Sequence, residues 1–449
     1  MLYTICFFAF SAGIILLNLW YALQRRWREG MWVVWLMSLL ILPGALRFVP
    51  TGGFVINFPM VAGLSCLISY LVSPVPLPRY RFMISDVAAV LAPIAILASQ
   101  FSHNEQTPMS IPSAFCQWLL PYVMGRIFLV SADDIPKVSR IVGGLCVVNA
   151  LIGLFEAVTH VSLSTKLLGV WYLTEGGRFG MSRAHNFFGH PITMGQVMVM
   201  MLPWCLVASR KTSRSRIGKW FYPGMNLLAI VTTLTRGAIL GFFESLYLIA
   251  FTRSRHRFLM GLALAVAAAG LVLGEEMAIS VIASMGGEDE TGNSMIFIEG
   301  EPYMYNSARH RILQYKVFAV ALRDAGMTGL GPDLQGYMSR YNVAGVFSRS
   351  IDSHYILSTL QSGYFFLFSF HLITVCMIYR YGKIAWAKVG PYAPLASGLF
   401  AASIVGTVTW LSVFLTWELG IIYIFYSGLA CNLEVLERQR LRAAATDGS

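Results

Sequence analysis

Charged residues are scarce in this chain. Asp, Glu, Lys and Arg together make up 12% of its 449 residues, whereas hydrophobic residues make up 56%. About a quarter of the residues of a soluble globular domain are charged, so the composition excludes an ordinary soluble protein. The short segments of alternating polarity that a membrane β-barrel requires are also missing. The apolar runs are instead long and continuous, which predicts an all-α polytopic membrane protein.

Metal-ligand and disulfide patterns are missing too. The 7 cysteines all lie within apolar runs without metal-site spacing, so we expect them to be small buried side chains. His185 and His190 stand close in sequence, but no carboxylate accompanies them and their spacing matches no usual zinc ligand set. We therefore predict no metal and no cofactor. The net charge of +11 collects in the loops between apolar runs, so we predict no nucleic-acid partner.

Apolar runs recur along the whole chain, and one bilayer span takes about 20 such residues. They predict about 12–13 transmembrane helices. The first run is too long for a signal peptide and has no basic stretch before it, so we expect a retained helix. The runs are 3–23, 31–48, 53–73, 84–101, 112–130, 141–160, 190–208, 220–235, 237–252, 258–274, 354–379, 393–414 and 416–434.

The distribution of basic residues predicts the orientation. Arg25, Arg26 and Arg28 follow the first run, and every second loop after that is basic, as is the C-terminal tail. The positive-inside rule therefore predicts these loops and the tail in the cytoplasm. The chain divides into four parts. Transmembrane helices occupy 1–274, and a large polar loop on the opposite side of the membrane occupies 275–353. Further transmembrane helices occupy 354–434, and the tail is 435–449.

The polar stretch 274–364 interrupts the apolar sequence, and the chain is organised around it. Within it, 309–323 has the apolar spacing of a helix, and the stop and turn signals Gly326, Gly329 and Gly331 follow. We therefore expect a folded loop that lies along the membrane surface.

Basic residues on the non-cytoplasmic side oppose the positive-inside rule, and binding an anion would explain them. Arg236 lies at a turn between two apolar runs; the alternative is an arginine that extends to the membrane interface. Arg311 opens the loop helix, where the alternative is a solvated surface residue. His354 follows Asp352 and Ser353 at the start of an apolar run, and is either a polar anchor or a titratable catalytic group.

A further basic group is RFGMSRAHNFFGHPITMG, in which Arg178, Arg183, His185 and His190 precede an apolar run. Pro191 suits the first turn of a helix, and the exposed amides of a helix N-terminus bind anions. This segment is therefore a second candidate for anion binding.

Several charged residues lie inside apolar runs. Arg126 could pair with one of the acidic residues, or the group could form the relay of a transporter. A transporter is expected to show two-fold internal similarity and interrupted helices at matching positions, and the sequence predicts neither. The residues are Asp86, Arg126, Glu156, Glu244, His371 and Glu418.

Three stretches resemble the O-antigen ligase and polymerase superfamily of bacterial inner-membrane proteins. RAHNFFGHPITMG is similar to the family's Arg-x-x-Gly-Phe-x-x-Pro segment, and LTRGAILG to its Ser-Arg-Gly-Ala segment. RILQYKVFAVALRDAGMTGLGPDLQGY, followed by SHYILSTLQSGYFFL, resembles the large periplasmic loop and the His-Asn-x-x-Leu…Gly segment that ends it. The chain departs from the family pattern at Thr235 (usually Ser), Tyr355 (usually Asn) and Gln361 (often an acid), and Tyr355 cannot supply an amide.

The resemblance implies a GT-C-like helical bundle, that is, a metal-independent glycosyltransferase that uses a lipid-linked donor. Such proteins move a glycan from an undecaprenyl-diphosphate carrier to an acceptor hydroxyl on the periplasmic side. By position, Arg236 and Arg311 would contact the donor diphosphate, Arg183 and His190 would be further contacts, and His354 would sit at the reacting centre. Arginine suits this role because its guanidinium holds phosphate oxygens bidentately and stabilises the charge that develops on the leaving group. His354 would either accept the hydroxyl proton or orient the diphosphate.

The resemblance leaves three activities open. FFGHPI is more similar to the polymerases, so we expect a polymerase of O-antigen or exopolysaccharide that extends a growing glycan. The first alternative is an O-antigen ligase, for which the acceptor is lipid A core. The second is a flippase for lipid-linked glycans.

Overall fold

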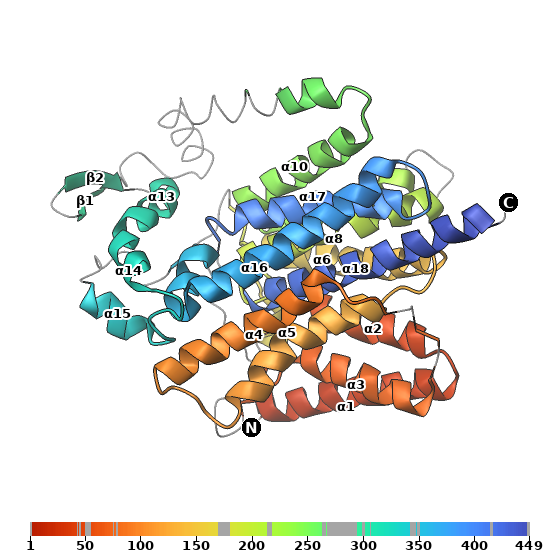
Figure 1. Cartoon of the computed structure of the whole chain (residues 1–449), viewed down its shortest axis with the longest axis horizontal. Helices are drawn as coiled ribbons and strands as arrows, with labels where there is room; N and C mark the ends of the chain where they lie inside the picture. Colours follow the sequence, from red (N-terminus) through yellow and green to blue (C-terminus); the bar gives the residue numbers. More distant parts are fainter. Residues whose placement is uncertain are drawn as a thin grey trace.

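The computed structural model of the chain is a bundle of long helices with a small folded unit at one end (Figure 1). The structure describes residues 2–42, 44, 46–49, 55–74, 76–77, 80–168, 180–212, 218–262, 266, 294–298, 301–305, 307–341, 347, 351–413 and 416–446.

The bundle is built mainly from helices that follow the predicted apolar runs, with two short helices, Leu163–Leu168 and Gly218–Trp220, between runs. They are α1 (Leu2–Leu23), α2 (Trp27–Leu40), α3 (Phe58–Val72), α4 (Ile84–Ser102), α5 (Ser110–Ile127), α6 (Asp134–Thr159), α7 (Leu163–Leu168), α8 (Pro191–Thr212), η1 (Gly218–Trp220), α9 (Phe221–Thr232), α10 (Arg236–Arg253), α16 (His354–Ala387), α17 (Ala393–Thr409) and α18 (Trp417–Thr446). The end unit contains β1 (Ser294–Ile298), β2 (Glu301–Tyr305), α13 (Ser307–Val317), α14 (Ala319–Asp324) and α15 (Leu334–Arg340).

Six helices in the described part of the chain are long and apolar enough to cross a membrane. They are Thr4–Leu23, Ile84–Ser102, Asp134–Thr159, Pro191–Arg210, His354–Ala387 and Glu418–Thr446. The structure therefore supports an all-α polytopic membrane protein, with fewer helices of spanning length than the predicted runs. The remaining runs contain shorter helices, and most of 258–274 lies outside the described residues.

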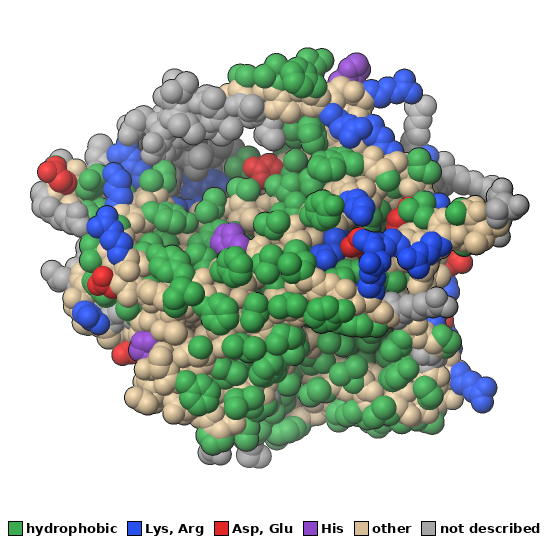
Figure 2. Space-filling model, in the orientation of Figure 1, with side chains coloured by type: hydrophobic (Ala, Val, Ile, Leu, Met, Phe, Trp, Pro, Cys, Tyr) green, Lys and Arg blue, Asp and Glu red, His purple; other side chains and the backbone are tan. Residues whose placement is uncertain are grey.

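Charge is distributed along the bundle as expected for membrane-crossing helices. In Figure 2, Lys and Arg side chains gather toward the two ends of the molecule, and hydrophobic side chains cover most of the surface between them. The hydrocarbon core of a bilayer excludes charge, so the apolar stretch suits lipid contact and the ends suit the two interfaces.

Helix α18 is the most buried of the long helices, with 94% of its apolar window inside the structure. Its backbone meets α5 at two glycines. A Cβ atom on Gly428 would lie 2.0 Å from Tyr122 O, and one on Gly125 would lie 2.1 Å from Phe425 O. Small residues permit this close approach, which is typical of helix pairs packed in membranes.

Arg126 is paired inside the bundle. Its guanidinium lies 3.5 Å from the carboxylate of Asp86, and it also donates to Arg81 O at 2.7 Å. Tyr122 Oη donates to the same carboxylate at 2.6 Å. A buried charge is costly unless it is paired and hydrogen-bonded. The structure therefore favours the pairing alternative for Arg126 over a transport relay.

The end unit contains the helix that the sequence predicts at 309–323, present as α13 and α14 with a junction at Phe318. Arg311 does not open this helix, because α13 begins at Ser307 and Arg311 lies in its second turn. The unit has an apolar core of its own, in which Phe318 packs with residues at the start of α16, including Leu360. The loop is therefore fixed to the bundle through α16.

Helix α16 is interrupted at Gly363, whose φ of 75° and ψ of −177° are not helical. A Cβ atom at this position would lie 2.3 Å from Met327 O, so both the backbone conformation and the close approach require glycine. The sequence does not predict this interruption, because LQSGYFFLF is apolar enough to continue a helix.

The loop after α14, 326–331, covers the break. The N–H of Tyr364 donates to Gly326 O at 3.0 Å, and the N–H of Leu330 donates to Leu360 O at 2.6 Å. An interrupted helix inside a membrane protein needs partners for the backbone groups that the break releases. Here the partners come from the end unit, which therefore clamps the two halves of α16.

Candidate functional site

Three arginines that are far apart in the sequence lie together where α8 and α10 begin. Arg236 is the first residue of α10, Arg311 lies in α13 and Arg183 lies in the loop before α8. Burial and the charges of Arg236 and Arg311 lower the pKa of Arg183 to about 10. All three side chains are partly buried. Since like charges repel, this arginine cluster has the electrostatics of an anion site.

The starts of α8 and α10 pack against each other beside the arginine cluster. A Cβ atom on Gly195 of α8 would lie only 2.6 Å from Ala238 Cβ of α10. His190 caps α8: the N–H of Ile192 donates to His190 Nδ1 at 3.1 Å, so neutral His190 carries its proton on Nε2. The N–H groups and dipoles of both helix starts add positive potential to that of the arginines.

Arg183 is held against the turn between α9 and α10. Its Nε donates to Thr233 O at 3.3 Å, and its Nη2 donates to Thr235 Oγ1 at 3.4 Å. The N–H of Ala184 donates to Thr232 O at 3.0 Å. The side chain of Thr235 therefore supplies a hydroxyl to this contact.

Glu156 anchors the loop that carries Arg183. Its Oε2 accepts from the N–H groups of His185 at 3.1 Å and Asn186 at 2.8 Å, and its Oε1 accepts from the N–H of Leu163 at 2.9 Å. Glu156 is only 3% exposed, and three backbone donors satisfy a buried carboxylate without a cation. The sequence singles out Glu156 only as a charge in an apolar run. Its partners are backbone amides, which no residue pattern reveals.

Two histidines and one carboxylate border the arginine cluster. Burial and the charge of Arg183 lower the pKa of His190 to about 4, and Asp352 opposes that shift. Burial also lowers the pKa of His310, and the charge of Asp352 opposes this shift as well. Asp352 Oδ2 lies 3.9 Å from His310 Nε2. Both imidazoles are therefore neutral near pH 7 and can act as hydrogen-bond donors without adding charge.

Arg311 is presented by a helix that is anchored to the start of α16. The N–H of Ser353 donates to Gln314 Oε1 at 3.2 Å, and Gln314 Nε2 donates to Arg311 O at 3.1 Å. Tyr315 Oη donates to Leu411 O at 2.8 Å and shares a hydrogen bond of 2.8 Å with Ser353 Oγ. The position of Arg311 relative to α16 is thus fixed by two neighbouring side chains of α13.

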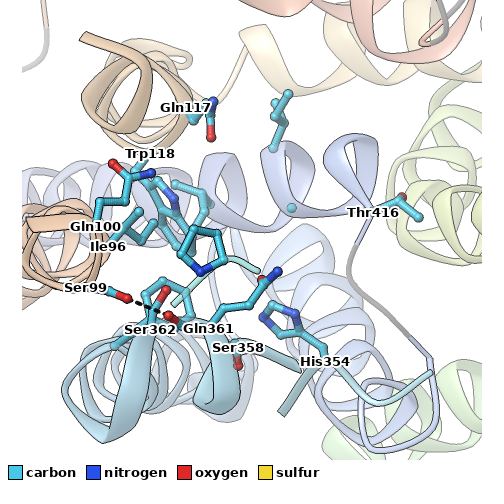
Figure 3. A pocket seen from close by; sticks show the side chains of 15 residues that line it. Ile96, Ser99, Gln100, Gln117, Trp118, His354, Ser358, Gln361, Ser362 and Thr416 are labelled. Carbon is cyan, nitrogen blue, oxygen red and sulfur yellow. Dashed lines mark hydrogen bonds between the residues drawn. The ribbon is translucent and has the colours of Figure 1, made fainter. Parts of the chain in front are cut away.

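His354, the next residue, lines a cavity of about 300 Å³ between α4, α5, α16 and α18 (Figure 3). Its ring packs edge-on against Phe370 at 5.1 Å and Trp410 at 6.3 Å. The structure therefore brings Arg183, Arg236, Arg311 and His190 into one neighbourhood. It places His354 in an adjoining cavity, next in sequence to Asp352 and Ser353.

The cavity beside His354 has a mostly apolar wall with several amide and hydroxyl side chains, and no Asp, Glu, Lys or Arg is among its described lining residues. Trp118 forms part of one wall and packs edge-on against Phe366 at 5.2 Å. Ser99 Oγ donates to Gln361 O at 2.6 Å, which joins α4 to α16 below the cavity (Figure 3). Amides and hydroxyls supply most of the polar lining: Ser99, Gln100, Gln117, Ser358, Gln361, Ser362 and Thr416. Such groups beside an aromatic ring suit an uncharged, hydroxyl-rich ligand.

Arg178 and the two histidines of the basic segment before α8 are candidate residues that lie apart from the arginine cluster or are tested as metal ligands. Arg178 lies outside the described residues. Within the described ranges, no group of three or more His, Cys, Asp or Glu side chains could hold a metal ion. His185, one of the two histidines considered, is buried beside Glu156, and its backbone N–H binds that carboxylate.

Comparison with protein-family models and with curated proteins finds no match for this chain. The arginine cluster and the cavity beside His354 are the features of the structure that bear on function.

Proposed function

We propose that this protein is a metal-independent glycosyltransferase that moves a glycan from a polyprenyl-diphosphate carrier to an acceptor hydroxyl. The observation that carries the proposal is the arginine cluster of Arg183, Arg236 and Arg311 at the starts of α8 and α10. A diphosphate offers oxygen atoms to several guanidinium groups at once and offsets their mutual repulsion. A lipid carrier would bring that anion along the bilayer to the helix ends.

In the proposed reaction the acceptor oxygen forms a bond to the anomeric carbon of the donor sugar. The bond from that carbon to the diphosphate oxygen breaks, and the lipid diphosphate leaves with the electron pair. The arginine cluster stabilises the charge that develops on the leaving oxygen, which is the main catalytic demand because a diphosphate is already an activated leaving group. His190 Nε2–H is a further donor to the diphosphate, and His354 is the proposed acceptor of the hydroxyl proton.

The cavity beside His354 supports a sugar as the second reactant. Its volume of about 300 Å³ accommodates a sugar ring, and its lining offers amides and hydroxyls beside Trp118 rather than ionic groups. The diphosphate would thus bind at the arginine cluster and the sugar in the adjoining cavity, and Asp352 and Ser353 connect the two in the chain.

Within this class we propose a polymerase that extends a surface polysaccharide, either O-antigen or exopolysaccharide. Ligation of the glycan to lipid A core is the alternative. The proposal includes a multi-pass protein of a bacterial inner membrane, with the arginine cluster and the large loop facing the periplasm and the C-terminus in the cytoplasm. The basic loops that the positive-inside rule assigns to the cytoplasm support this orientation.

One observation favours the transporter as a second candidate. Transporters of lipid-soluble and ionic substrates often use interrupted helices at their binding sites, and α16 is interrupted at Gly363. The released backbone groups, however, are partnered by the loop 326–331, which suits a structural joint better than a substrate site.

Reconstitution tests the proposal. The purified protein, in vesicles that hold an undecaprenyl-diphosphate-linked repeat unit, is expected to form chains of increasing length. Arg236→Gln and Arg311→Gln should each reduce transfer at least about 100-fold, because each removes a transition-state charge contact. The matched control Arg323→Gln, at an exposed position of α14, should retain transfer. When lipid A core is added to the vesicles, transfer only to that core would indicate the ligase, and movement of the carrier without transfer would indicate the transporter.

A further inference from the structure

A second cationic cavity lies at the opposite ends of α8 and α10. It has a volume of about 320 Å³ and is lined by Arg210, Arg253 and Lys388, together with small and apolar residues such as Gly390 and Pro394. Helix α8 contains 22 residues, which is ~33 Å at the usual rise of an α-helix. The cavity is therefore separated from the arginine cluster by about the thickness of a bilayer core, and it has no part in the proposed transfer.

Among the described residues, no carboxylate neutralises the three cations that line this cavity. Burial, with a further contribution from the charge of Arg210, lowers the pKa of Arg253. Within the part of the chain that the structure describes, none of the three forms an ion pair. Arg440, whose guanidinium would lie 3.1 Å from a Cβ atom on Gly390, is by contrast paired with Glu437 at 2.7 Å. The positive charge of the cavity is therefore not balanced by a carboxylate of the described residues, whereas that of the neighbouring Arg440 is balanced by Glu437.

Backbone carbonyls position two of the cations. Arg253 Nη2 donates to Pro394 O at 3.2 Å, and Lys388 Nζ donates to Ser254 O at 3.0 Å. These contacts use one donor of each side chain. A guanidinium has five N–H donors and an ammonium has three, so both side chains retain donors for an oxygen-rich ligand.

Apolar side chains flank the cavity on the chain segment that carries Lys388. Trp386 is 48% exposed and Val389 is 68% exposed. An exposed tryptophan near a basic residue at the end of an apolar helix is typical of the membrane interface, where the headgroup and the first part of the acyl chain meet the protein.

We propose that this second cavity binds a phosphate group, which Arg210, Arg253 and Lys388 hold together. The phosphate could belong to the headgroup of an anionic phospholipid or to a small soluble phosphate, and both present the same anionic oxygens. The flanking Trp386 and Val389 favour the lipid. Such a site would couple the stability of α8, α10 and α16 to the lipid composition of the membrane.

Thermal unfolding of the full-length purified protein in neutral detergent at low salt tests this site. Phosphatidylglycerol is expected to raise the Tm by several degrees, and phosphatidylcholine, whose headgroup is neutral overall, is expected to leave it nearly unchanged. The double variant Arg210→Gln, Arg253→Gln should lose most of the shift. The control Arg255→Gln, Arg442→Gln removes the same charge from exposed positions and should keep it.

Inorganic phosphate separates the two sources of the ligand. A shift with phosphatidylglycerol alone assigns the site to a lipid headgroup, and an equal shift with millimolar inorganic phosphate assigns it to a soluble phosphate. If Arg253→Gln prevents folding, Arg210→Gln alone serves as the variant, since Arg210 is exposed. Equal loss of the shift in the double variant and the control would overturn the proposal, as would the absence of a shift with both ligands.

Discussion

The backbone N–H of Ser353 donates to Gln314 Oε1 at 3.2 Å, which joins the loop helix α13 to the N-cap of α16. Gln314 is fully buried, and the Ser353 side chain in turn caps α16 by accepting from the N–H of Ile356. The two sides of the proposed site, Arg311 and His354, therefore share one support. A change at this support should disturb both.

Replacing Gln314 with leucine, which is of similar size, should destabilise the protein by about 1–3 kcal/mol because it leaves the Ser353 N–H buried without its acceptor. The variant should also bind pyrophosphate more weakly, since Arg311 is three residues away on the same helix. Thermal unfolding and calorimetric titration measure the two effects. Gln106→Leu, at an exposed position, should change neither, and an unchanged Tm for Gln314→Leu would contradict the role of this contact.

The arginine cluster should be more stable without one of its charges until an anion binds. We expect Arg311→Gln to leave the Tm of the ligand-free protein unchanged or slightly higher, because repulsion of Arg183 is relieved. The stabilisation by pyrophosphate should fall, with at least about a 10-fold weaker Kd. Arg323→Gln is the control. A lower ligand-free Tm together with an unchanged Kd would indicate a structural arginine instead.

Gly363 should not tolerate a side chain. Gly363→Ala forces a non-glycine residue into a φ of 75° and puts its Cβ 2.3 Å from Met327 O, so the cost should exceed about 2 kcal/mol. Gly144→Ala is the matched control, because a Cβ atom there meets nothing within 4 Å and α6 is helical around it. The control should be neutral or stabilising by up to about 1 kcal/mol. Faster proteolysis of the end unit in Gly363→Ala would show that the clamp has opened.

Glu156 should act as an acceptor and not as a charge relay. Glu156→Gln keeps the size but replaces one acceptor oxygen with a donor, which leaves a buried N–H of Leu163, or those of His185 and Asn186, without a partner. The expected cost is about 1–3 kcal/mol in unfolding free energy, with weaker pyrophosphate binding through Arg183. Glu244→Gln, on the exposed face of α10, should have no effect on either measurement.

His190 should make stability depend on pH in the acid range. Its pKa falls from the ordinary value of 6.5 to about 4 in the folded protein. Between these values the unfolded chain binds the proton and the folded protein does not, so stability falls as the pH drops through this window. The loss at pH 4 should be about 2 kcal/mol after allowance for the partial exposure of the ring.

The variant His190→Asn isolates this contribution, because asparagine can still cap α8 but does not titrate. Its Tm should therefore decline less than that of the wild type between pH 6.5 and pH 4. Parallel curves for the two proteins would contradict the shifted pKa. His310, whose pKa burial also lowers, remains in both proteins and cancels in the comparison.

Much of the architecture follows from local pattern. Apolar runs such as 84–101 and 141–160 become α4 and α6 because a helix satisfies its own backbone where water is excluded. The apolar spacing of 309–323 likewise predicts a helix, and α13 and α14 occupy that range. The arginines that oppose the positive-inside rule could be recognised from the sequence, because a charged side chain in an apolar run is costly whatever tertiary structure the chain adopts.

The amino-acid sequence by itself therefore determined the helical class, the membrane-like composition and which basic residues are candidates for binding an anion. Only the tertiary structure decided that Arg183 and Arg236 meet, that Glu156 binds backbone amides, and that Gly363 interrupts α16 against Met327. The physical reason is the range of the forces involved. Helix formation depends on hydrogen bonds between residues a few positions apart, and membrane insertion depends on the hydrophobicity of one continuous segment. A site depends instead on side-chain packing between segments that are distant in the chain.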